Sequence, residues 1–495
     1  MTLTGPPLVA ERGVPSDDAR AATRGSLALT VLQTAGRLLA VGFVLVATRV
    51  LAPGSFGRYS TASAFVVIGG LLADFGTTTV IVRRVSRDPD GSDTLLTRTV
   101  LACLGLGVAS ALAVAAVAVV AGYPAATRTD VLIAALALPP SACLTSILGA
   151  LDGRGLIARR AVLTFVQLAV VTLGGTVGVL VAGARGAVIA LAVGPALTLV
   201  VAAVQLRRHG VWSLRVQGHR AASVALLRDA LPFGVLAGIS ALQLRFDVVL
   251  LSLVGTAAET ARYDLAVRVL EALAYLGTVV AAPALFILSR RLGGGDRAGA
   301  QRALNEAGRF LALVGVPVSA LLVGLHDPLV TVAFGSRYQG VALPLAIVGG
   351  QLWLAFLAGL QGAAILAGDR VWPAVPVAAG VVGVIVGLDL VLVPTFGAVG
   401  AAAATVAGTL VMIGALGRFL ARHAGLRTPR PASRVVAAGL LTAVVAMVVA
   451  PVGLFAAAVA AAVVYAGVVL LTGAVTGADL GRLRALTRTA PKVVP

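Results

Sequence analysis

Apolar runs of about 20 residues recur along the whole chain, and they limit its fold more than any other feature. A helix rises about 1.5 Å per residue, so such a run is long enough to cross the hydrocarbon core of a bilayer. Hydrophobic residues make up 59% of the chain, which excludes a soluble globule. We therefore predict an all-α polytopic membrane protein with about fourteen transmembrane helices.

The basic residues predict the orientation in the membrane. Most of the 39 lie in connections on one side, whereas few lie on the other side, among them Arg58, Arg185 and Arg337. Because arginine and lysine concentrate in cytoplasmic loops, we predict the cytoplasmic membrane as the location, with both termini cytoplasmic. The same rule accounts for the formal net charge of +19, so no nucleic-acid partner is predicted.

Matching landmarks in the two halves of the chain predict an internal duplication. Arg58-Tyr59 opens the second apolar run, and Arg262-Tyr263 opens the eighth. Further along, GARGAVIALAVG is similar to FGAVGAAAATVAG. Six helices per repeat is an even number, so we expect a pseudo-two-fold axis along the membrane normal.

This duplication predicts how the chain is divided. The predicted parts are a cytoplasmic N-terminal tail (1–25), an N-terminal six-helix bundle (26–206), a cytoplasmic linker (207–229), a C-terminal six-helix bundle (230–421), a cytoplasmic loop with two extra transmembrane helices (422–474) and a cytoplasmic tail (475–495).

Charged residues within the apolar runs are the candidate functional residues. A charge at the bilayer centre costs at least ~2.5–3.5 kcal/mol on insertion scales, so it needs a partner, a watery cavity or a ligand. Arg37 and Arg245 have no carboxylate three or four residues away. We expect both to bind an anionic substrate, with Gln33 assisting Arg37 from one helical turn away. Alternatively, Asp74 neutralises Arg37.

A stripe of polar residues follows the eighth apolar run. Helical spacing places its members on one face: Asp264, Arg268, Glu271 and Tyr275. We assign Arg268 to substrate binding, and Asp264, Glu271, Asp74 and Asp247 to ion coupling or charge balance. Two alternatives stay open: Arg268 belongs to a self-neutralised helix face, and Asp247 pairs with a neighbouring helix and only stabilises the bundle.

Catalytic and cofactor motifs are absent from the sequence. The four histidines lie in loops or at span ends, and the two cysteines lack the spacing of metal ligands. No nucleotide-binding loop or nucleophile motif occurs. We therefore predict a transporter and not an enzyme, with no cofactor and no metal site.

The first hairpin resembles the start of a known family. ATRVLAPGSFGRYSTASAF followed by LLADFGTTTVIVRRVSR is similar to Wzx-type polysaccharide flippases of the multidrug/oligosaccharidyl-lipid/polysaccharide exporter superfamily. The family's Gly-x-(Phe/Tyr)-Gly-x-(Tyr/Phe) turn is matched by Gly54–Tyr59, and its Asp-Phe/Leu-Gly by Asp74-Phe75-Gly76. RDALPFG resembles the family's entry into the second half, and the resemblance extends over roughly residues 25–475.

This resemblance implies flipping of an undecaprenyl-pyrophosphate-linked oligosaccharide to the outer leaflet by alternating access, for cell-surface polysaccharide biosynthesis. The implied partners are the lipid-linked oligosaccharide, membrane lipid, a coupling ion (H⁺ or Na⁺) and polysaccharide assembly proteins. A pyrophosphate suits arginine in a desolvated interior. Two alternatives remain: an ion-coupled multidrug or small-molecule exporter, which would favour an acidic interior, and a membrane polysaccharide polymerase, which should have a large outer loop.

Overall fold

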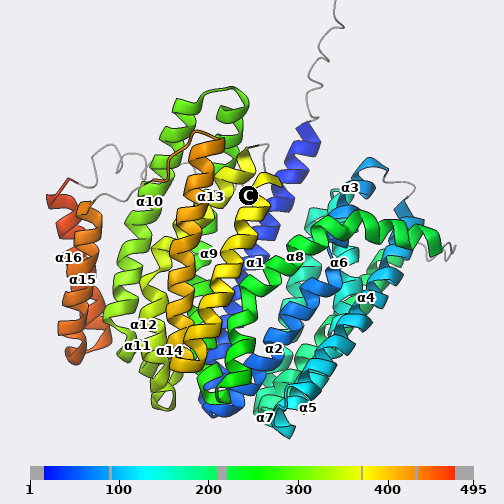
Figure 1. Cartoon of the computed structure of the whole chain (residues 1–495), viewed down its shortest axis with the longest axis horizontal. Helices are drawn as coiled ribbons and strands as arrows, with labels where there is room; N and C mark the ends of the chain where they lie inside the picture. The colour runs from blue at the N-terminus through cyan, green and yellow to red at the C-terminus, as the bar shows by residue number, and fades with distance from the viewer. Residues whose placement is uncertain (1–15, 89–91, 209–219, 369–371, 430–432, 474–495) are drawn as a thin grey trace, which may run out of the picture.

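The computed structural model describes residues 16–88, 92–208, 220–368, 372–429 and 433–473. These residues are almost entirely helical, which confirms the predicted all-α multi-pass membrane protein. Helices α2 to α7 lie on one side of the bundle and α9 to α14 on the other, with α15 and α16 at the edge (Figure 1). Much of the predicted tails and of the linker (1–15, 209–219 and 474–495) lies outside the described residues.

The elements follow one another along the described chain with no strand among them. Their bounds are α1 Ser16–Val50, α2 Pro53–Asp74, α3 Thr77–Arg87, α4 Ser92–Val120, α5 Ala125–Ala135, α6 Leu138–Gly153, α7 Ile157–Arg208, α8 Arg220–Val254, α9 Ala257–Gly293, α10 Arg297–Gly324, α11 His326–Phe334, η1 Ser336–Val341, α12 Ala342–Gly350, α13 Leu352–Ala367, η2 Trp372–Ala374, α14 Val375–His423, α15 Ser433–Val449, η3 Ala450–Val452 and α16 Leu454–Leu471.

Two helices begin earlier than the sequence predicted. α1 begins at Ser16, within the predicted tail 1–25, and α8 begins at Arg220, within the predicted linker 207–229. A helix need not stop at the bilayer surface, so hydropathy located the apolar part of α1 and missed its polar start.

Two helices are too long for one crossing. α7 has 52 residues and α14 has 49, whereas about 20 are enough to cross a bilayer. Each contains a break at a glycine with positive φ, Gly183 at 62° and Gly397 at 56°. Residues with a Cβ rarely adopt this conformation, so glycine permits the chain to turn back there.

The two legs of each long helix pack against each other. A Cβ on Gly178 would lie 2.4 Å from the carbonyl oxygen of Gly186, and one on Gly400 would lie 2.0 Å from that of Leu392. Each contact joins residues on opposite sides of the break, so α7 and α14 are helical hairpins. Eleven described helices are long and apolar enough to cross a membrane, or up to 12 if one bent pair is a single span. The hairpins support about fourteen crossings, which stays a prediction.

The packing of equivalent helices supports the predicted duplication. α1 packs along α7, α8 packs along α14, and α2 packs against α9 between the halves. Ser60 and Asp264, which are 204 positions apart as the repeat predicts, are joined by a hydrogen bond of 2.6 Å. Residues related by a two-fold axis can touch only near that axis. The pseudo-two-fold axis remains a prediction that this contact supports.

The two halves are not packed symmetrically. α2 packs extensively along α8 as well as α9, whereas the described part of α1 makes no comparably extensive contact with α9. The seam between α1 and α9 is therefore more loosely packed than the equivalent seam between α2 and α8, and Arg37 meets the polar stripe of α9 across it.

Candidate functional site

The polar stripe of α9 faces the interface between the halves. α9 starts with a capping box, in which Thr256 accepts from the backbone N–H of Glu259 and the Glu259 carboxylate accepts from that of Thr256. This start sets the position of the helix at the predicted outer end. From there the stripe meets side chains of α2, α8 and α1 in turn.

Arg245 of α8 is neutralised by the stripe. Its Nη1 lies 3.2 Å from Oδ1 of Asp264, and its Nη2 lies 2.9 Å from Oε2 of Glu271. The arginine side chain is only 10% exposed. Arg245 has no carboxylate three or four residues away on α8, yet it is paired with two carboxylates of α9. Its partners lie on the neighbouring helix, which spacing along α8 cannot reveal.

Arg268 shares one of these carboxylates. Its Nε lies 2.7 Å from Oδ2 of Asp264, and its Nη2 donates to the Ser63 hydroxyl over 3.1 Å. Ser60 donates to the same Asp264 oxygen. We name Arg245, Asp264, Arg268 and Glu271 the charge cluster; its two cations and two carboxylates balance. Sequence analysis missed Ser60 and Ser63; the repeat offset of 204 positions aligns Ser60 with Asp264 and was the available signal for that residue.

Arg37 lies at the other end of the stripe. Its guanidinium carbon lies 4.0 Å from the ring centroid of Tyr275, one helical turn beyond Glu271. The side chain is exposed and, within the part of the chain that the structure describes, it forms no ion pair. Stacking uses the flat face of the guanidinium and leaves the N–H donors on its edge for a ligand. Gln33 lies half-buried one turn away on α1.

Asp74 has a different role from the predicted balance of Arg37. It ends α2, and its carboxylate accepts from the backbone N–H of Thr78 at 3.3 Å and from the hydroxyls of Thr77 and Thr78. These residues open α3, where a carboxylate is favoured by the helix dipole. In this conformation Asp74 therefore caps α3 and does not pair with Arg37.

Asp247 belongs to a second polar group, inside the C-terminal half. The Tyr263 hydroxyl donates to Asp247 and shares a 2.7 Å hydrogen bond with the Thr405 hydroxyl. Asp389, on the first leg of α14, lies within electrostatic range of Asp247 and is 2% exposed. Among the described atoms, its Oδ1 has no hydrogen-bond partner. The sequence analysis did not assign Asp389 to this group, because the three helices meet only in the folded bundle.

A family model described as "Polysaccharide biosynthesis protein" matches residues 46–343. No curated protein matches the chain. The lipid II flippase MurJ, in an inward closed conformation, is 14% identical, with a TM-score of 0.73 over 91% of this chain and 99% of that one. An inward-facing multidrug resistance MATE family transporter of the MOP superfamily is 18% identical, with a TM-score of 0.61 over 78% and 96%.

A MOP superfamily transporter from Pyrococcus furiosus is 14% identical, with a TM-score of 0.56 over 87% of this chain and 96% of that one. At such identities, the similarity to these three structures shows a shared fold. The chain therefore has the helical fold of MurJ and the MATE transporters.

Proposed function

Because the chain belongs to the family of polysaccharide biosynthesis proteins, we propose that it flips an undecaprenyl-pyrophosphate-linked oligosaccharide across the cytoplasmic membrane by alternating access. Arg37 carries this proposal. It is an exposed cation inside a membrane bundle, without an ion pair among the described residues, beside a charge cluster that is already neutral. A cation at that place favours an anionic ligand.

The geometry around Arg37 suits a pyrophosphate. Tyr275 holds the guanidinium by its face, so its edge can bind phosphate oxygens in the bidentate manner that arginine favours. The Glu271 side chain is 43% exposed, so an incoming phosphate can replace it on Arg245. Arg268, whose side chain is 23% exposed, is the third proposed substrate contact, and Gln33 the fourth.

Contacts between the two halves near the α1–α2 turn support loading of the substrate from the opposite side of the membrane. The Tyr338 hydroxyl donates to the Leu51 carbonyl at 2.9 Å, and Arg49 donates to the carbonyl of Val332. Both contacts join the N-terminal half to the C-terminal half. That end is the predicted outer end, so these contacts support a conformation closed on the outside, while the exposed Arg84–Asp229 pair bridges α3 and α8 at the opposite end. The loosely packed α1–α9 seam is the proposed entry for the substrate, whose lipid tail stays in the bilayer.

We assign the coupling of H⁺ or Na⁺ to the second polar group. The support is the buried Asp389 oxygen without a hydrogen bond and its electrostatic proximity to Asp247. Asp264 and Glu271 are assigned to charge balance, since both are engaged by arginine. Polysaccharide assembly proteins remain predicted partners.

Complementation of a flippase-deficient strain tests the proposal. The wild-type chain should restore surface polysaccharide, whereas Arg37→Ala at matched expression should leave the lipid-linked oligosaccharide on the inner leaflet. Arg128→Ala is the matched control, because Arg128 is an exposed arginine on α5 away from the stripe. A wild-type chain that exports cationic drugs and leaves the oligosaccharide unflipped would favour the multidrug-exporter alternative.

A further inference from the structure

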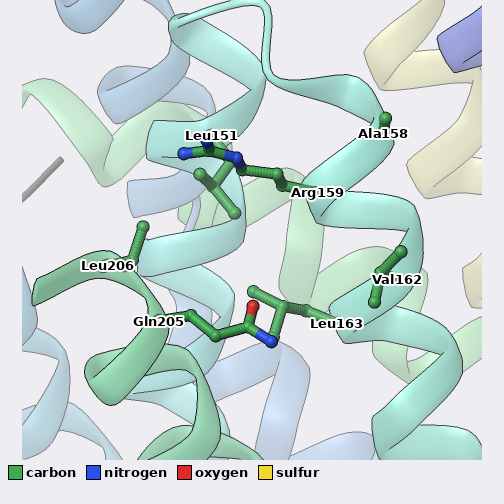
Figure 2. Close-up of a pocket in the computed structure, with 7 residues that line it drawn as sticks. All are labelled: Leu151, Ala158, Arg159, Val162, Leu163, Gln205 and Leu206. Atoms are coloured by element: carbon green, nitrogen blue, oxygen red, sulfur yellow. The ribbon is translucent and has the colours of Figure 1, made fainter. Parts of the chain in front are cut away.

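A cavity of about 460 Å³ lies in the N-terminal half, and none of its lining residues belongs to the charge cluster (Figure 2). It is located where α6 ends and where both ends of the α7 hairpin meet. Its volume falls in the range of ~300–1,000 Å³ that is usual for ligand sites. The predicted orientation places it at the cytoplasmic surface of the membrane.

The floor of the cavity is apolar and well packed. It consists of Leu151 from α6 and Leu163 and Leu206 from the two legs of α7, which are 1%, 1% and 3% exposed. These leucines belong to an apolar cluster that includes Ile81 and Val85 of α3. Above this core, the apolar lining that remains accessible to a ligand is Val162, which is 43% exposed, and the exposed Ala158.

The rim of the cavity is polar. Figure 2 shows Arg159 lying across Leu151, and Gln205 reaching towards Leu163. The neighbouring Arg160 is paired with Asp152, at 3.3 Å, whereas Arg159 is exposed and makes no ion pair within the ranges that the structure describes. An unpaired cation therefore lies directly beside an apolar surface.

We propose that this cavity binds an anionic glycerophospholipid of the adjacent leaflet. Its phosphate lies on the Arg159 guanidinium, one acyl chain lies over Ala158 and Val162, and the Gln205 amide binds the ester region. Charge complementarity favours this occupant, because the cytoplasmic leaflet carries anionic lipids that arginine at the surface attracts. A free phosphate would leave the exposed apolar side chain of Val162 uncovered. This site is separate from the transported substrate, and the proposal does not depend on the transport activity.

Native mass spectrometry of the delipidated full-length protein tests the proposal, with phosphatidylglycerol, phosphatidylcholine and inorganic phosphate as probes. We expect the wild type to retain phosphatidylglycerol in preference to phosphatidylcholine. Arg159→Ala removes the cation, and Ala158→Phe places a ring in the cavity that Ala158 lines. Each should reduce phosphatidylglycerol retention at least fivefold. Arg207→Ala is the control, since Arg207 is a nearby exposed arginine that does not line the cavity.

Three outcomes would overturn the proposal. Equal retention of the two lipids would show that charge does not select the occupant. Undiminished phosphatidylglycerol retention in both variants would place the lipid elsewhere. In a thermal-shift measurement on the wild type, inorganic phosphate that raises the melting temperature as much as phosphatidylglycerol does would identify a simple anion site. A normal size-exclusion profile of each variant confirms that a lost adduct is not a consequence of misfolding.

Discussion

At the scale of single residues, the charge balance of the bundle interior depends on the Asp264 carboxylate, which two arginines share. Asp264 has a side chain that is 2% exposed, and it binds Arg245, Arg268 and the Ser60 hydroxyl. Removing one partner of a buried ion pair leaves the other charge uncompensated, which costs more than the pair itself contributes. The cluster therefore holds α2, α8 and α9 in one arrangement.

Replacing Asp264 by Asn should be strongly destabilising. The change leaves Arg245 with Glu271 alone and Arg268 without a carboxylate, at a cost on the order of 3–5 kcal/mol. Thermal unfolding in detergent should show a clearly lower melting temperature. Glu271→Gln is the control and should cost less, because the Glu271 side chain is 43% exposed. Equal melting temperatures for the two variants would contradict the role of Asp264.

Substitutions of Arg37 distinguish ligand binding from charge balance. Arg37→Lys should be only partly active, because an ammonium lacks the planar fork that grips phosphate. The double change Arg37→Ala with Asp74→Ala should remain inactive, since Asp74 caps α3 and does not balance Arg37. Complementation at matched expression measures both. Restored export in the double variant would make Arg37 a structural residue.

Asp296, which lies outside the predicted membrane spans, predicts that the stability of the fold depends on pH. It caps α10, and its pKa lies below the ordinary value of 3.8, chiefly because the Gly299 backbone N–H and then Arg291 bind the carboxylate. A depressed pKa means that this stabilisation is complete above pH 3.8 and is lost as the pH falls through the folded value. The melting temperatures of wild type and Asp296→Ala should therefore differ at pH 7 and converge only once the pH is below the folded pKa. A difference that persists in acid would contradict this assignment.

At the scale of elements, the hairpins of α7 and α14 depend on close backbone contact. Gly186→Ala would place a Cβ 2.0 Å from the Gly178 carbonyl oxygen, so the two legs of α7 must separate. We expect a large loss of folded protein, measured by fluorescence-detected size exclusion. Gly387→Ala on α14 is the matched control, because no atom lies within 4 Å of its added Cβ. Equal loss for both variants would show that helix propensity, and not leg contact, sets the effect.

At the scale of the whole molecule, the halves are joined at the α1–α2 turn and by the Arg84–Asp229 pair at the opposite end, and they are loosely packed along the α1–α9 seam. The end at the α1–α2 turn should face outwards. Cysteines introduced at the exposed positions Ala52 and Arg337 should react with an impermeant maleimide in intact cells, whereas a cysteine at exposed Ser289 should react only after permeabilisation. The reverse pattern would invert the predicted topology.

The sequence by itself determined the helical membrane fold and the faces of its helices. Apolar run length and spacing are local properties, so they located the stripe from Asp264 to Tyr275 and showed that Arg37 has no carboxylate three or four residues away on its own helix. They could not identify partners on other helices.

Only the tertiary structure decided those partners. The packing of α8 on α9 pairs Arg245 with Asp264 and Glu271, and the seam between α1 and α9 stacks Arg37 on Tyr275. The turn after α2 directs Asp74 to α3 instead of α1. Helical periodicity fixes the direction in which each side chain leaves its own helix axis. Contact between two helices depends in addition on how each helix is tilted and shifted in the bundle.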